Sequence, residues 1–335
     1  MTMLTETPRA SDIRLADDLR FDHVVPRALV HRAAICEVFV SDSERLSDDR
    51  YLVAGQLPRT HSFYNDCLLP YYDLLLTLET ARQGAVLVAH RYLGVPLGYA
   101  FIFQSVDLRI TDLDAHRIGP EPGRLVVEVE IVDRQERDGV LAVMGLRMGL
   151  AIDGRSCSEA TGAGVFLPRE AYQGLRAHVR SRKALEQAPA PAPRRPLPPT
   201  AVGRLNPRNV VVAEARLGPT PPGVSTDVLV DRTHPCLFDH PLDHVPGMLL
   251  LEAYRQSAIL ATTGAAGSPA ERAVLTRCQA VFTEFAELEL PTLSTVSTGT
   301  AIERLPEGPA VPAEVVLSQA TGPVSTGTAE VTLCR

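Results

Sequence analysis

The chain has 335 residues, 45% of them hydrophobic and 22% charged, which is enough for about two globular domains with buried cores. A formal net charge of −7 argues against a nucleic-acid-binding surface or a polybasic membrane surface. The polar N-terminus is not a signal peptide, no apolar run reaches the ~20 residues that span a bilayer, and six cysteines without a CxxC pair predict reduced thiols in the cytoplasm.

The first half of the chain predicts strands around one long helix. Residues 1–22 indicate a loosely docked arm before a domain at 23–167. Alternating apolar and polar residues after Arg27 predict a strand that ends at Val40, before an acidic turn. Asp138-Gly139 predicts a hairpin turn. The other expected elements are strands at 51–57, 97–110, 125–133 and 140–153, a loop at 58–70 and a helix at 71–90.

Residues 168–203 are expected to link two domains. Their first part, 168–187, predicts a short basic helix, and 188–200 is a proline-rich spacer that favours an extended backbone. A basic helix could dock on a phosphate-bearing partner, but the composition favours a solvated linker. The second domain, 204–335, repeats the order of the first, with strands expected at 210–217, 227–231, 276–290, 311–318 and 327–334 and a loop and helix at 232–262.

Two segments of the chain are copies of each other. Residues 59–83 align without a gap with residues 232–256, and ten of the 25 positions are identical. Ordinary composition gives roughly one or two identities by chance, so the repeat indicates a duplicated domain. A long apolar helix wrapped by an antiparallel sheet, twice over, predicts an α+β fold of two hotdog domains that pair within the chain as a pseudo-dimer.

Both predicted helices carry charge within an apolar sequence. Burying charge is costly unless the charge is paired. A single i,i+3 pair is most simply a structural ion pair, but two matching pairs in two apolar helices favour a functional role. The recurring residues are Glu79, Arg82 and Gln83 in the first helix and Glu252, Arg255 and Gln256 in the second.

The loop before the second helix is rich in His, Asp and Pro. A functional role and a hydrogen-bonded loop that fixes the helix entry are both open interpretations. No metal is expected, because the spacing matches no standard ligand pattern, and no cofactor is expected. His61 and His234 are expected to be structural. The candidate residues here are Asp239, His240, Asp243, His244, Gly247 and Met248.

The helix entry DHPLDHVPGMLLLEAYRQ resembles the signature of β-hydroxyacyl-carrier-protein dehydratases, although His240 lies closer to Glu252 than the dehydratase histidine would. A longer resemblance covers nearly the whole chain. HPCLFDHPLDHVPGMLLLEAYRQ in the second half, with LPRTHSFYNDCLLPYYDLLLTLETARQ and VLVAHRYLGVPLGYAF in the first, is similar to the A-factor biosynthesis (γ-butyrolactone synthase) family of actinomycetes.

This resemblance implies an acyltransferase that moves a β-ketoacyl group from acyl carrier protein, or coenzyme A, to a hydroxyl of dihydroxyacetone phosphate or a related three-carbon acceptor. The product leads to a butenolide or γ-butyrolactone autoregulator of antibiotic production. The resemblance implies no nucleic-acid or membrane partner and leaves further homo-oligomerisation open. The functional candidates that it implies are Glu79, Arg82, Glu252 and Arg255.

The expected chemistry divides among these residues. The backbone N–H groups of Gly247 and Met248, at a helix N-terminus, would hold the thioester carbonyl. A carboxylate in an apolar helix is expected to have a raised pKa and to act as general base. The arginine is expected to bind phosphate or to orient the carboxylate.

The two halves differ where the site would form. Cys67 stands in place of His240, and Asp73-Leu74 in place of Pro246-Gly247. By analogy with dehydratase-like dimers, one site joins the His240 loop to Glu79 and the other joins the Cys67 loop to Glu252, and the first is the better catalytic candidate. A hotdog thioesterase or dehydratase on carrier-bound acyl groups, and a non-catalytic acyl-binding protein, are the alternative functions.

Overall fold

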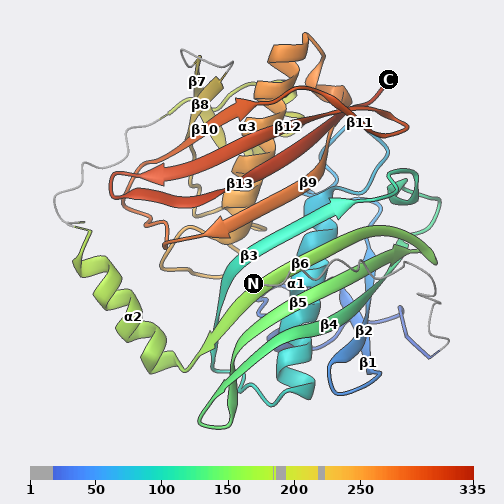
Figure 1. The fold of residues 1–335 in the computed structure, drawn as a ribbon, viewed down its shortest axis with the longest axis vertical. Coiled ribbons are helices and arrows are strands. Elements are labelled where there is room, and N and C mark those ends of the chain that lie inside the picture. The colour runs from blue at the N-terminus through green and yellow to red at the C-terminus, as the bar shows by residue number, and fades with distance from the viewer. Residues whose placement is uncertain (1–17, 184, 186–193, 218–222) are drawn as a thin grey trace, which may run out of the picture.

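The computed structural model describes residues 18–183, 185, 194–217 and 223–335. Most of the expected N-terminal arm, 1–17, and part of the proline-rich spacer, 188–193, lie outside the described residues. Within this described part, 13 strands form one antiparallel sheet that runs from the first half into the second (Figure 1). The strand order is β1-β2-β4-β5-β6-β3-β9-β13-β12-β10-β8-β7, with β11 beside β12.

The elements of the two halves follow one plan, in which two strands precede a long helix and the remaining strands follow it. The first half contains β1 (Val40–Arg45), β2 (Arg50–Leu57), α1 (Leu74–Tyr92), β3 (Ala100–Ile110), β4 (Gly123–Arg137), β5 (Val140–Ile152) and β6 (Arg155–Leu167). After α2 (Arg169–Ser181), the second half contains β7 (Val212–Leu217), β8 (Gly223–Val228), α3 (Gly247–Ala266), β9 (Ala273–Phe282), β10 (Thr292–Thr298), β11 (Ile302–Leu305), β12 (Gly308–Gln319) and β13 (Gly322–Leu333).

Helices α1 and α3 are buried against the concave side of the sheet, and Figure 1 shows them crossing behind the strands of their own halves. Both are apolar around most of their circumference, as expected for helices enclosed in a core. Helix α1 approaches β2 so closely that a Cβ at Gly55 would lie 2.6 Å from the Thr80 methyl group. The helices are therefore fixed in position by packing, and so are the charged residues that they carry.

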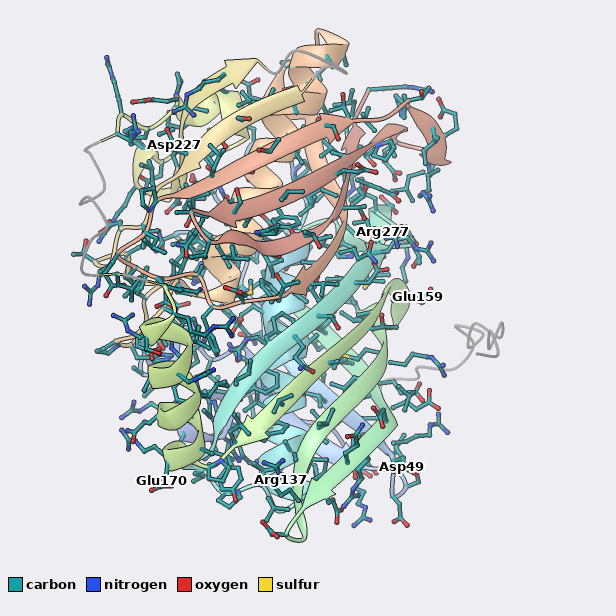
Figure 2. The ribbon with its side chains drawn as sticks, turned by 60° about the vertical axis from the view of Figure 1, so that its left-hand side comes forward. Asp49, Arg137, Glu159, Glu170, Asp227 and Arg277 are labelled. Carbon is teal, nitrogen blue, oxygen red and sulfur yellow. The ribbon has the colours of Figure 1, made fainter. Side chains whose placement is uncertain are left out.

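The two halves are joined edge to edge through β3 and β9. These strands pair in antiparallel fashion from Ser105–Val281 to Arg109–Arg277. Arg277, which lies where the strands of the two halves adjoin (Figure 2), donates a hydrogen bond of 2.7 Å to Asp107 across this junction. The predicted α+β tandem hotdog, paired within one chain, is confirmed. None of the described helices is both long and apolar enough to cross a membrane.

The predicted strand over residues 27–40 is wrong. The segment forms two 3₁₀ turns, Arg27–Val30 and Ile35–Glu37, and the first strand begins only at Val40. His31 between the turns has a left-handed backbone with φ of 53°. The segment crosses α1 instead of joining the sheet because Gln83 of that helix bonds its backbone, accepting from the N–H of Phe39 at 3.0 Å.

Strands β1, β6, β10 and β11 were not predicted, and the strand predicted at 276–290 ends at Phe282. The predicted hairpin at Asp138-Gly139 is confirmed by φ values of 54° and 74°. Asp153-Gly154, with φ values of 48° and 81°, makes a second turn of the same kind between β5 and β6. That second Asp-Gly pair was a usable signal for the missed strand β6.

The second repeat unit extends back into the expected linker. The 3₁₀ turns Pro199–Val202 and Pro207–Asn209 correspond, at an offset of 172 residues, to the two turns of the first half. Gly203 takes the left-handed position that His31 takes in the first half, with φ of 68°. The equivalent units therefore include the segment before each long helix, and this segment supplies part of each site.

Candidate functional site

Glu252 in α3 is buried in a cluster of hydrogen-bond donors. Arg204 donates from Nε and Nη2 to the two carboxylate oxygens, at 2.9 Å and 2.6 Å. Arg255, one turn along the helix, lies 3.4 Å from Oε1, and Gln256 donates to the same oxygen. Both Arg204 and Glu252 are fully buried, so the pairing with Arg204 removes most of the cost of burying this carboxylate.

Glu79 in α1 has the same surroundings. Arg82 donates to Oε2 and Oε1, both at 2.8 Å, Gln83 donates to Oε1 at 2.7 Å, and Arg32 takes the place of Arg204. Burial by itself raises the pKa of the Glu79 carboxyl, but the Arg32 and Arg82 guanidiniums outweigh burial and lower the pKa to about 2. The expectation of a raised pKa at this carboxylate is therefore wrong.

Arg32 and Arg204 are the functional candidates that sequence reasoning missed. They lie outside the 25-residue repeat and align only at an offset of 172 residues, where Val30 and Val202 are identical as well. The change of offset from 173 to 172 hid them from the ungapped comparison. Extending the repeat with a one-residue gap would have found them.

The glutamines that follow the charged pairs tie the helices to the segments before them. Gln83 donates to the carbonyl of Glu37 at 2.7 Å, and Gln256 donates to the carbonyl of Asn209 at 2.7 Å. Each also accepts a backbone N–H two residues further on, and each donates to its own glutamate. This places Gln83 and Gln256 behind the carboxylates, where they orient them.

The loops before the helices exchange hydrogen bonds between the halves. The carboxylate of Asp239 accepts the backbone N–H groups of Ala33 and Ala34, at 2.6 Å and 2.8 Å. Asp66, at the matching position of the first half, accepts the N–H of Asn206 at 3.1 Å. Asp239 therefore holds the His240 loop of the second half against the segment that carries Arg32 in the first half.

A cavity of about 840 Å³ lies where these two segments meet. Its lining combines polar and charged side chains with apolar ones, and the start of α3 forms part of the wall. The polar residues include His31, Arg32, Arg82, His240 and His244. The start of α3 contributes Pro246, Gly247 and Met248. The apolar residues include Phe101, Phe103, Leu167, Leu175, Val179 and Phe282.

The pseudo-equivalent site around Glu252 is filled. The hollow beside Arg204 and Arg255 measures only about 30 Å³. The ring of Phe63 stacks on the Arg204 guanidinium, 4.7 Å from ring centroid to Cζ. The matching residue in the open site is Cys236, which is much smaller than Phe63. The two positions match because the backbone N–H of Phe63 donates to His61 and that of Cys236 donates to His234, in each case the preceding histidine of the loop.

His31, which lines the cavity, is paired with a second histidine, His90. The Nε2 atoms of His31 and His90 lie 2.8 Å apart, and His90 Nδ1 donates to the carbonyl of Val95. This bond fixes the neutral His90 with an unprotonated Nε2, so that His31 donates from Nε2 and keeps the lone pair on Nδ1. Burial, with the neighbouring His90 and Arg82, lowers the pKa of His31 to about 3, so this imidazole stays neutral.

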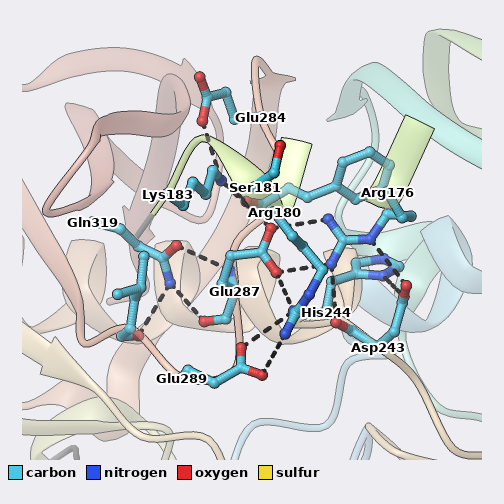
Figure 3. A network of polar contacts seen from close by, with 12 residues as sticks. Arg176, Arg180, Ser181, Lys183, Asp243, His244, Glu284, Glu287, Glu289 and Gln319 are labelled. Atoms are coloured by element: carbon cyan, nitrogen blue, oxygen red, sulfur yellow. Dashed lines mark hydrogen bonds and ion pairs between the residues drawn. The ribbon is translucent and has the colours of Figure 1, made fainter. Parts of the chain in front are cut away.

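Helix α2 forms one wall of the cavity and is held by a buried ion network (Figure 3). Arg176 is only 3% exposed and donates to both oxygens of Glu287, at 2.9 Å and 2.8 Å, and to Asp243 at 2.9 Å. Arg180 and Lys183 also face the fully buried Glu287. The interpretation of this basic segment as a solvated linker is therefore wrong, because its cations bind the second half of the chain.

Asp243 and His244 belong to the edge of this network. Asp243 accepts hydrogen bonds from Arg176, from the hydroxyl of Tyr172 at 2.8 Å and from His244 Nδ1 at 2.7 Å. Although burial raises the pKa of the Asp243 carboxyl, these donors together lower it well below its usual range. Asp243 thus fastens α2 to the loop, while the ring of His244 lines the cavity.

A group of three side chains, missed by sequence reasoning, includes Cys236 of the cavity lining. One potential ligand atom from each of Glu37, His61 and Cys236 lies within 4.8 Å of the others. His61 Nδ1 accepts two backbone N–H groups of its own loop, and its Nε2 lies 3.4 Å from Glu37. Burial raises the pKa of the Cys236 thiol, so it is protonated. His234 accepts two backbone N–H groups in the same way.

The fold and the paired clusters define a tandem-hotdog protein with one open site and one filled site. The A-factor biosynthesis hotdog domain matches residues 14–168 and 185–335. The chain belongs to this family. It is 35% identical over 272 residues to the 2-oxo-3-(phosphooxy)propyl 3-oxoalkanoate synthase of Streptomyces virginiae, covering 80% of this chain and 85% of that protein.

A second relative agrees with this assignment, and a solved structure shares the fold. The synthase of the same name from Streptomyces griseus is 35% identical over 251 residues, covering 74% of this chain and 79% of that protein. A crystal structure described as an oleoyl thioesterase from Lactobacillus plantarum is 11% identical, covers 85% of this chain and 97% of its own, and has a TM-score of 0.50. That likeness concerns the fold alone.

Proposed function

We propose that this chain transfers a β-ketoacyl group from an acyl carrier protein or coenzyme A thioester to a hydroxyl of dihydroxyacetone phosphate. The open cavity carries the proposal, because it brings Arg32 and Arg82 together with apolar side chains such as Phe101 and Leu175 around one space of about 840 Å³. The product named for the Streptomyces relatives is the ester of a 3-oxo acid with this acceptor. Its place is the cytoplasmic synthesis of a γ-butyrolactone or butenolide autoregulator.

The thioester carbonyl is held at the start of α3. Gly247 and Met248 line the cavity, and their N–H groups have no recorded hydrogen bond within the described chain. A helix N-terminus favours the negative charge that develops on the carbonyl oxygen during attack. In the filled site the corresponding N–H, that of Leu75, is already bonded to Asp73 at 2.9 Å.

His240 is the general base of the proposed reaction. Glu79 is unsuitable, because its pKa is about 2 and its oxygens accept from two arginines and a glutamine. His31 is a weak base, because burial lowers its pKa to about 3. The side chain of His240 lines the cavity and is 36% exposed, and its Nδ1 lies 3.5 Å from a carboxylate oxygen of Asp239.

The bonds and protons of the proposed acyl transfer balance without a cofactor. His240 takes the proton of the acceptor hydroxyl as its oxygen attacks the thioester carbonyl. The carbon–sulfur bond breaks, and the departing thiolate takes that proton from His240. Glu79 is a positioning residue that holds Arg32 and Arg82 toward the cavity, and apolar residues such as Phe101 and Leu175 receive the acyl chain.

Mass spectrometry of the purified protein with a β-ketoacyl thioester and dihydroxyacetone phosphate tests this proposal. A phosphorylated ester that forms only when the acceptor is present supports it. Release of free β-keto acid regardless of the acceptor would instead establish a thioesterase. An untouched thioester, with carrier-protein and coenzyme A donors alike, would leave an acyl-binding protein and overturn the proposal.

A further inference from the structure

We propose that Arg32 and Arg82 together form the phosphate subsite of the open cavity, at the place that Asp73 marks in the filled site. This inference rests on the proposed function and adds the location of the acceptor's phosphate. Arg32 is new to the site, since only Arg82 stood out in the sequence. The two pseudo-equivalent clusters differ in charge.

The filled cluster is neutral. Arg204 and Arg255 face Glu252, and they also face the carboxylate of Asp73, whose Oδ2 lies 3.7 Å from Arg204 Nη1 and 3.3 Å from Arg255 Nε. Two positive charges therefore meet two negative charges. Asp73 comes from the other half of the chain, at the residue before α1. It acts as a built-in anion that occupies the space between the two arginines.

The open cluster lacks this anion. The position equivalent to Asp73 is Pro246, the residue before α3, and the two have nearly the same backbone, with φ/ψ of −61°/137° and −59°/141°. Arg32 and Arg82 thus face Glu79 alone and keep one uncompensated positive charge beside the cavity. Two other carboxylates of this region have their own partners, because that of Glu37 faces His61 at 3.4 Å and that of Asp239 accepts the backbone N–H groups of Ala33 and Ala34.

The arginines also have donors to spare. Arg32 and Arg82 bind Glu79 through Nε and Nη2, and for Nη1 of either residue no hydrogen bond is recorded within the described chain. Both side chains are slightly exposed, at 11% and 12%, and both line the cavity. Guanidinium donors at a water-accessible, positively charged site match the oxygens of a phosphate monoester.

Placing a carboxylate at position 246 tests the subsite. Pro246→Asp recreates the arrangement of Asp73, and Pro246→Asn is the matched control with the same shape and capping ability but no charge. Binding of inorganic phosphate is measured by titration calorimetry for both variants and the wild type. We expect wild type and Pro246→Asn to bind phosphate alike and Pro246→Asp to bind it at least about tenfold more weakly, because like charges repel.

Equal phosphate affinity in Pro246→Asp and Pro246→Asn, or no binding to the wild type, would overturn the subsite. If Pro246→Asp does not fold, Arg82→Gln replaces it, with the same expected tenfold loss. The readout is independent of acyl transfer. If the variants bind phosphate as expected but the protein transfers no acyl group, only the proposed function is refuted. If the protein transfers the acyl group but the variants do not show the expected phosphate affinities, only the subsite is refuted.

Discussion

Asp73 lies 3.3 Å from Nε of Arg255, and this ion pair has no equivalent in the other half, where Pro246 precedes the helix. Together with the ring of Phe63 over Arg204, it fills one of two otherwise matching sites. The duplication has therefore produced one open site and one filled site whose opposite charges face each other within the protein. We propose that the open site binds the ligand, whereas the equivalent residues of the filled site stabilise the fold.

The small side chain of Cys236 keeps the cavity open beside Arg32, so a larger side chain at this position should close the site. We expect Cys236→Phe to fold and to reduce acyl transfer by about 100-fold, because the ring takes the place that Phe63 takes beside Arg204. Cys236→Ala, which adds no bulk, is the control and should stay within a few-fold of wild type. Steady-state rates, with urea unfolding to show a folded variant, provide the measurement. Wild-type rates in Cys236→Phe would show that the space beside Arg32 is not used.

Arg176 fastens the wall of the cavity. Replacing it with Met leaves Glu287 fully buried with fewer partners, so we expect the free energy of unfolding to fall by about 3 kcal/mol. The KM for the thioester should rise as α2 loosens. Arg169→Met, at an exposed position of the same helix, is the control and should change neither quantity. Urea unfolding measures the free energy of unfolding, and initial rates measure the KM. An unchanged stability in Arg176→Met would mean that the ion network contributes nothing to holding α2 against the second half of the chain.

His116 should make the protein less stable in mild acid. It is fully buried, and burial lowers its pKa from 6.5 to about 4. The unfolded chain therefore binds a proton below pH 6.5 that the folded chain excludes until about pH 4, and stability falls as the pH drops through this window. We expect His116→Gln, which keeps a polar group near Ser158, to remove about 2 kcal/mol of the stability difference between pH 7 and pH 5. Identical pH dependence in both proteins would contradict the assignment.

The duplication allowed the fold to be predicted from the sequence. A gapless repeat around two apolar helices identified the tandem arrangement, and Asp-Gly pairs marked a hairpin. Local alternation failed at residues 27–40, because Gln83 and Asp239 bind the backbone of this segment and draw it across α1. Such long-range bonds leave no periodic signal, and tertiary contacts routinely override local preference.

The candidate site was predicted in part. Glu79 and Arg82 stood out because charge in an apolar helix requires partners, but the main partner, Arg32, lay in a segment interpreted as a strand. The direction of the Glu79 pKa could not be inferred without that arginine, since burial alone raises it. One site is filled and the other is open because Phe63 lies beside Arg204 whereas Cys236 lies beside Arg32. Each of these contacts joins the two halves of the chain and exists only in the folded protein.

The rates of Glu79→Gln and Glu252→Gln, measured with one β-ketoacyl thioester and dihydroxyacetone phosphate, test the central claim most directly. Glu79→Gln leaves Arg32 and Arg82 without a carboxylate, and Glu252→Gln leaves Asp73 alone against two buried arginines, so both should lower the free energy of unfolding by about 3–5 kcal/mol. Only Glu79→Gln should lose acyl transfer, by about 100-fold or more, while Glu252→Gln stays within a few-fold of wild type. Loss of transfer in a folded Glu252→Gln, with Glu79→Gln intact, would place the reaction in the filled site and contradict the account.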